Sequence, residues 1–137
     1  MNGLENKYII KNNKRLRYGY TTGSCAAGAA SGAVRMLLSG RELSEVTLPT
    51  PKGITLTLAL HDITRGDNYV SCAVRKDAGD DPDTTNGILV YVKAEKICCR
   101  DSETDNCEDI GTGAGRPQII LDGGIGVGRV TKPGLSQ

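Results

Sequence analysis

Hydrophobic and polar residues alternate strictly over residues 54–60, where isoleucine or leucine occupies every even position and threonine most odd ones. This period of two predicts a strand with one buried face. Two further runs, residues 69–76 and 88–96, are rich in residues that favour strands and flank an acidic, glycine-containing loop at 77–87. We expect these two runs to pair as a hairpin with a long loop, and residues 118–121 to form a last short strand.

Residues 24–39 carry apolar side chains at helical spacing, and Gly40 follows at the position of a C-cap glycine. The pattern predicts a helix over this range. Gly28 and Gly32 lie four residues apart on one face of it, and each costs the helix about 1 kcal/mol relative to alanine. We therefore expect a close neighbour on that face, either the sheet, which is the favoured interpretation, or a flat ligand.

One helix and at least four strands, mostly joined by turns, predict an α+β fold in which the small-residue helix covers a mixed or antiparallel sheet. The chain of 137 residues is long enough for one hydrophobic core. Residues 1–16 are polar and basic and are interpreted as a partly ordered N-terminal arm, and residues 17–137 as the domain. Within the domain, residues 98–116 show neither period and predict a surface loop.

The amino-acid composition limits which binding partners and which cellular compartment we expect for the protein. Seventeen basic and sixteen acidic residues give a formal charge of +1, so no nucleic-acid footprint is expected. Five cysteines, odd in number and without a CxxC pair, favour reduced thiols and a cytoplasmic protein. No signal peptide and no apolar run long enough to cross a membrane is expected, so the prediction is a soluble protein.

The start of the predicted helix is the first candidate site. Thr21, Thr22 and Ser24 place hydroxyl groups beside free backbone N–H groups at the positive end of a helix, an arrangement that suits a carboxylate or phosphate. The alternative is an ordinary N-cap supplied by Thr22 or Ser24. Residues 23–28 have the glycine spacing of a phosphate loop, but alanines stand where lysine and a hydroxyl residue are required. Nucleoside triphosphate hydrolysis therefore loses its main support.

The acidic loop is the second candidate site, because four carboxylates occur within seven residues, those of Asp77, Asp80, Asp81 and Asp83. A calcium loop counted from Asp77 would need glycine and glutamate where Pro82 and Ile88 stand, so the pattern of an EF-hand is absent. The loop could instead attract a diffuse cation, accept a proton or face a sulfonium group. A solvated turn that uses Asp and Pro only for its geometry is the alternative.

The glycine-rich segment 123–129 follows a predicted strand but lacks the spacing of a dinucleotide fingerprint. It is interpreted as a backbone platform that lets a ligand approach, with Arg129 and Lys132 available to pair with carboxylates. His61 is expected to end a strand and receives little weight as a catalytic group. Cys25 could have a lowered pKa at the helix start, although small-residue packing explains it equally well.

Three segments, "RYGYTTGSCAAGAA", "VRKDAGDDPDTTNG" and "GGIGVGRVTKPGL", occur in this order and resemble the N-terminal part of the CbiD family, the cobalt-precorrin-5B (C1)-methyltransferases of anaerobic cobalamin biosynthesis. The resemblance implies transfer of a methyl group from S-adenosylmethionine to ring carbon C1 of a tetrapyrrole that carries its own cobalt. Members of the family are more than twice as long as this chain. A C-terminal region is therefore the expected partner, and the fragment alone is expected to be inactive.

The resemblance also gives the candidate residues a shared task, because the substrate has many acetate and propionate arms. The residues predicted to bind these arms are Arg17, Thr21, Thr22, Ser24, Gly126, Gly128, Arg129 and Lys132. Asp80, Asp81 and Asp83 are predicted to face the sulfonium or manage a ring proton, with Asp80 and Asp81 as the catalytic candidates. No residue is predicted to bind a metal. Two alternatives stay open, a binding module without chemistry and a purely structural domain, and the oligomeric state is left open.

Overall fold

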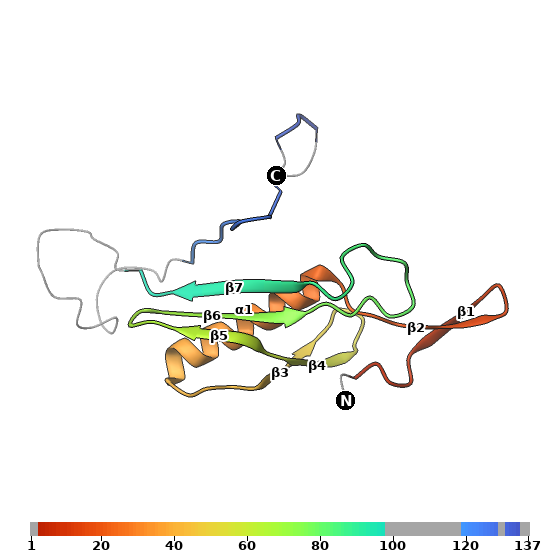
Figure 1. Ribbon diagram of the computed structural model, residues 1–137, viewed down its shortest axis with the longest axis horizontal. Coiled ribbons are helices and arrows are strands. Elements are labelled where there is room, and N and C mark those ends of the chain that lie inside the picture. Colours follow the sequence, from red (N-terminus) through yellow and green to blue (C-terminus); the bar gives the residue numbers. More distant parts are fainter. Residues whose placement is uncertain (1–2, 98–118, 129–130, 135–137) are drawn as a thin grey trace, which may run out of the picture. The chain divides into compact units, whose positions relative to one another are not determined.

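The computed structural model describes residues 3–97, 119–128 and 131–134, and the chain divides into two units, Met1–Ile97 and Cys98–Gln137. All helices and strands of the described residues lie in the first unit (Figure 1). They are β1 Tyr8–Lys11, β2 Lys14–Arg17, α1 Thr22–Ser39, β3 Glu45–Pro49, β4 Thr55–Ala59, β5 His61–Arg65, β6 Tyr69–Arg75 and β7 Leu89–Glu95. Within the described residues, no helix combines the length and hydrophobicity that crossing a bilayer requires.

A three-stranded antiparallel sheet with the order β5-β6-β7 forms the centre of the first unit, and α1 packs against one face of it (Figure 1). The β6–β7 ladder runs without interruption from Tyr69 opposite Glu95 to Arg75 opposite Leu89. This confirms the predicted hairpin with a long loop. The α+β fold class is confirmed as well, with antiparallel sheets in place of a mixed one.

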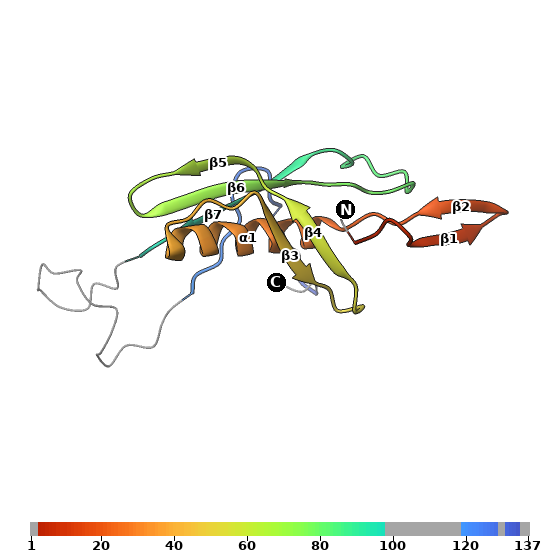
Figure 2. The same ribbon diagram turned by 90° about the horizontal axis from the view of Figure 1, so that it is seen from below.

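A second antiparallel ribbon, β3–β4, crosses α1 obliquely and completes the core (Figure 2). Its strand β4 has the predicted alternation, with Leu56 and Leu58 buried. A Cβ atom at Gly28 would lie 2.6 Å from Cδ1 of Leu58, and one at Gly32 would lie 2.6 Å from Cδ1 of Leu60. Leucine side chains of the β-strand layer therefore pack against the small-residue face of α1. The close neighbour of this face is the sheet and not a flat ligand.

The helix begins two residues earlier than predicted, and its cap is a different residue. Thr21 is the N-cap, since its hydroxyl oxygen accepts the backbone N–H of Ser24 at 3.1 Å. The prediction of Thr22 or Ser24 as the cap was wrong, because both have already entered the first turn. At the other end, Gly40 has the left-handed φ of 70° and donates to the carbonyl of Met36, as the C-cap prediction required.

Four strands were not predicted. In the N-terminal segment, β1 and β2 form a hairpin whose turn residues Asn12 and Asn13 have positive φ angles of 51° and 60°. Three of the four residues of β2 are charged, which hid it. In β5, a register shift between His61 and Thr64 interrupts the alternation, and β3 ends in a proline-rich turn that masked it. The sequence pattern of these four strands is weak, and the strands are stabilised by pairing with their neighbours.

The predicted strand at 118–121 was wrong for its described part, because Ile119, Ile120 and Leu121 belong to no strand. Residue 118 and the predicted surface loop at 98–116 lie outside the described residues. His61 begins β5 and does not end a strand as expected.

Candidate functional site

Two predicted motifs that are about 60 residues apart meet backbone to backbone in the first unit. The N–H of Tyr20 donates to the carbonyl of Asp77 at 2.8 Å, and the N–H of Asp80 donates to the carbonyl of Arg17 at 3.1 Å. Between these two hydrogen bonds, Tyr18 and Gly79 form an isolated antiparallel bridge. The segment that leads into α1 and the start of the acidic loop therefore form a single clamp.

Glycines make this close approach possible. A Cβ atom on Gly19 would overlap the carbonyl carbon of Ala78 and the carbonyl oxygen of Asp77. On the other side of the clamp, Gly79 has a φ of +66°, which side chains rarely tolerate. The clamp therefore needs glycine in both segments.

Arg17 and two of the loop carboxylates reinforce the clamp. The Arg17 guanidinium donates to both oxygens of Asp77, at 2.8 and 2.9 Å, and its backbone N–H donates to Oδ2 of Asp80 at 2.7 Å. Hydrogen bonding from the guanidinium holds the pKa of Asp77 below its usual range, and the same pair raises the pKa of Arg17. The guanidinium that was predicted to bind substrate is thus already engaged by a carboxylate of its own chain.

Lys76 is a buried cation that the sequence interpretation missed. It is only 7% exposed, and its ammonium group donates to Asp83 and, at 2.6 Å, to the hydroxyl of Thr85. The hydrogen bond from Lys76 is the main reason why the pKa of Asp83 lies far below its usual value. The alternation along β6 could have revealed this burial. Val70, Cys72 and Val74 are buried, and Lys76 is the next residue in the same every-second-residue series. A lysine at such a position needs a carboxylate partner.

The clamp borders an open groove of about 750 Å³. Five of the predicted site residues line this groove, namely Arg17, Thr21, Thr22, Asp80 and Asp81. Ser24 does not line it, because its N–H and hydroxyl are engaged with the Thr21 side chain. Among the described residues, the Asp81 side chain has no hydrogen-bond or ion-pair partner, and the N–H groups of Thr22 and Gly23 have no acceptor. The groove thus offers a carboxylate and helix N-terminal donors.

Replacing Thr21 with alanine is expected to lower the free energy of unfolding by about 1 kcal/mol, because the helix then lacks the acceptor for the Ser24 N–H. Urea denaturation followed by circular dichroism measures the change. The matched control is Thr22→Ala, which removes a hydroxyl that makes no hydrogen bond within the described residues. Equal losses in the two variants would contradict the assignment of Thr21 as the cap.

The predicted glycine platform belongs to the second unit. Gly126 lies in a turn in which the N–H of Val127 donates to the carbonyl of Gly124 at 3.2 Å. Gly128 and Lys132 are exposed, and Arg129 lies outside the described residues. The binding roles of these four residues stay predictions.

The thiols of the first unit are structural. Cys25 and Cys72 are free and completely buried, and burial raises the pKa of both thiols. The hypothesis of a lowered pKa for Cys25 was therefore wrong, because loss of hydration outweighs the lowering by the nearby charge of Lys76. Small-residue packing explains this position. Within residues 3–97, 119–128 and 131–134, no three His, Cys, Asp or Glu side chains are grouped to hold a metal ion.

The first unit is an α+β fold with one small-residue helix and a polar groove at the N-terminal end of that helix. The CbiD family model matches residues 9–137, so the chain belongs to the CbiD family. Relatives named cobalt-precorrin-5B C(1)-methyltransferase include those of Ruminiclostridium cellulolyticum (45% identical over 94% of the chain), Thermoanaerobacter sp. (47% over 93%) and Alkaliphilus metalliredigens (48% over 94%).

The chain spans 29% of the length of the Ruminiclostridium relative and 30% of the lengths of the other two. No solved structure matches the chain. The comparisons therefore identify the family of the chain. What the groove can bind must be argued from the residues that line it.

Proposed function

We propose that the whole protein methylates C1 of cobalt-precorrin-5B with S-adenosylmethionine, yielding cobalt-precorrin-6A in anaerobic cobalamin biosynthesis. The observation that carries the proposal is the identity of 45–48% to proteins named cobalt-precorrin-5B C(1)-methyltransferase across 93–94% of this chain. Within that protein the chain supplies the groove, and the region that continues in the relatives completes the active site. The buried free thiols Cys25 and Cys72 support a reducing compartment, the cytoplasm.

The charges of the groove support a division of tasks between its two walls. Ion pairs neutralise Asp77 and Asp83, so Asp80 and Asp81 supply the negative field of the acidic loop. Opposite them, the N–H groups of Thr22 and Gly23 and the nearby hydroxyls can donate to carboxylate arms of the tetrapyrrole. The residues present therefore suit an anionic substrate on the helix side and a cationic group on the loop side.

S-adenosylmethionine would supply the electrophilic methyl group, and its methyl–sulfur bond would break as the bond to ring carbon forms, so that the sulfur becomes a neutral thioether. The fit of the chain to this donor rests on the Asp80 and Asp81 carboxylates, whose charge favours a sulfonium over a neutral group. Such a displacement depends mainly on holding the reacting atoms in line. We propose that Asp81 holds the cationic group, and that Asp80, held by the Arg17 N–H, fixes the loop beside it.

The substitution Asp81→Asn tests this role in the whole enzyme. A chimera in which this chain replaces the aligned N-terminal part of the Ruminiclostridium relative is assayed for methyl transfer to cobalt-precorrin-5B. We expect Asp81→Asn to lower kcat/KM about tenfold, the loss of one charged contact. We expect the substitution to leave folding intact, because the Asp81 side chain is exposed and forms no hydrogen bond or ion pair within the described residues.

The matched control is Asp67→Asn, which removes an exposed carboxylate in the turn between β5 and β6. We expect it to leave kcat/KM unchanged. A chimera that folds, as judged by circular dichroism, and transfers no methyl group would contradict the proposed function. Equal effects of the two substitutions would contradict the role of Asp81.

A further inference from the structure

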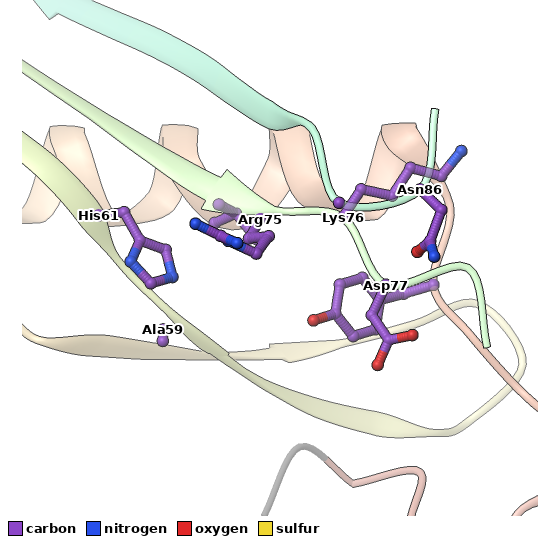
Figure 3. Close-up of a pocket in the computed structure, with 9 residues that line it drawn as sticks. Ala59, His61, Arg75, Lys76, Asp77 and Asn86 are labelled. Atoms are coloured by element: carbon purple, nitrogen blue, oxygen red, sulfur yellow. The ribbon is translucent and has the colours of Figure 1, made fainter. Parts of the chain in front are cut away.

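A second pocket of about 370 Å³ lies where β4 ends, β5 begins and β6 ends (Figure 3). It shares Tyr20 and Lys76 with the groove, so the backbone that carries these two residues borders both spaces. Its remaining polar lining includes His61, Arg75 and Asn86. The proposed function uses none of these three side chains.

The strand register places His61 and Arg75 together. His61 lies opposite Ala73 in the β5–β6 ladder, and Arg75 follows Ala73 by two residues, so all three side chains stand on one face of the sheet. This is the face that α1 does not cover, because Val70, Cys72 and Val74 of β6 have the opposite parity and belong to the core under α1. Figure 3 shows the imidazole of His61 and the guanidinium of Arg75 beside each other in the pocket.

The donors of this pocket lack acceptors within the described residues. The side chains of Arg75 and His61 form no hydrogen bond or ion pair with a described residue. Asn86 uses its side-chain oxygen to accept the Ala78 N–H at 2.9 Å, which leaves its NH₂ group available. Burial raises the pKa of Tyr20, so its hydroxyl keeps its proton and is a further donor.

One acidic residue, Asp77, lines the pocket, but its carboxylate does not cancel the charge of Arg75. Asp77 is held by both nitrogens of the Arg17 guanidinium, and Lys76 is matched by Asp83. Asp62, on the neighbouring strand, accepts the hydroxyl of Tyr91 and does not line the pocket. The pocket therefore has a net positive field with several converging N–H and O–H donors.

We infer that this pocket binds a carboxylate, with Arg75 as the ion-pair partner and His61, Asn86 and Tyr20 as further donors. A guanidinium fork matches the planar geometry of a carboxylate. The volume is at the lower end of small-molecule sites and suits a carboxylate arm. The identity of the carboxylate rests on the proposed function, in which it belongs to a peripheral arm of the tetrapyrrole. This pocket then anchors the substrate at a point outside the groove.

The test is an NMR titration of the isotope-labelled 137-residue protein. The probe is propane-1,2,3-tricarboxylate, and its uncharged triamide is the matched control. We expect the tricarboxylate to shift the signals of the His61 ring, the Arg75 Nε and the Asn86 NH₂ group, and the triamide to shift none of them. Arg75→Gln is expected to weaken binding about tenfold or more, because it removes the guanidinium that pairs with the carboxylate. His61→Gln is expected to have a smaller effect in the same direction.

Arg35→Gln is the matched control variant, since Arg35 is exposed on α1 and has no partner among the described residues. Equal shifts with the triamide, or equal losses in Arg35→Gln and Arg75→Gln, would overturn the inference.

A porphyrin octacarboxylate and S-adenosylhomocysteine distinguish the two sources of a carboxylate. Binding that depends on Arg75 for the porphyrin alone supports the tetrapyrrole arm, whereas the same dependence for S-adenosylhomocysteine alone overturns it. An inactive chimera together with Arg75-dependent tricarboxylate binding would reject the proposed function and retain the pocket.

Discussion

Replacing Gly19 with alanine is expected to lower the free energy of unfolding by about 3 kcal/mol and to open the clamp between residues 17–20 and 77–80. The added methyl group would overlap main-chain atoms of Asp77 and Ala78, which no side-chain rotation can relieve. The two segments must therefore separate. That movement lengthens the hydrogen bonds from Tyr20 to Asp77 and from Asp80 to Arg17.

Urea denaturation measures the loss of stability, and amide hydrogen exchange of Tyr20 and Asp80 reports on the clamp itself. We expect exchange of these two amides to accelerate more than that of the β6–β7 ladder. The matched control is Gly23→Ala, because a methyl group there meets only the Thr21 hydroxyl, at 3.6 Å, and favours the helix. Exchange that stays protected at Tyr20 in Gly19→Ala would show that the clamp tolerates a side chain and would contradict this account.

The parts of the fold that the sequence predicted are those with a long, regular pattern. The β6–β7 hairpin has two strands of seven residues each, and α1 has an apolar spacing over four turns and a glycine C-cap. The missed strands have five residues or fewer, and their pattern is interrupted by a bulge in β5 or by charged side chains in β2. Short strands gain their stability from pairing partners, which a local pattern does not contain.

The candidate site follows the same rule. The helix start and the acidic loop were predicted separately, from residue types that a local window contains. Their meeting depends on backbone hydrogen bonds between residues about 60 positions apart, and on which of several carboxylates pairs with Arg17. Lys76 was predictable in principle, because the period of two assigns it to the buried face. The interpretation included Lys76 in the predicted strand at 69–76 but did not use the period of two to assign its side chain to the buried face.

Removing either partner of the Lys76–Asp83 ion pair is expected to destabilise the protein, but by different amounts. We expect Asp83→Asn to lower the midpoint of urea denaturation at pH 7 more than Lys76→Met does. Asp83→Asn leaves an ammonium group that is almost completely buried, with the Thr85 hydroxyl as its remaining partner. Lys76→Met leaves a carboxylate whose side chain is 31% exposed and can be hydrated. Removing the partner of a buried charge is the more costly change. The double substitution is expected to recover part of the loss, because it removes both charges.

The pH dependence gives an independent test of the same pair. The pKa of Asp83 is lowered in the folded protein, so its stabilising contribution is present above the ordinary Asp pKa near 4 and is lost as the pH falls below it. The pKa of Asp77 is lowered by Arg17 and changes stability in the same direction. Denaturation between pH 7 and pH 3 should therefore show a flatter decline in Asp83→Asn than in the wild type, while Asp67→Asn retains the full slope. An unchanged slope in Asp83→Asn would mean that hydration of Asp83 outweighs its bond to Lys76, and the buried lysine would then need another anion.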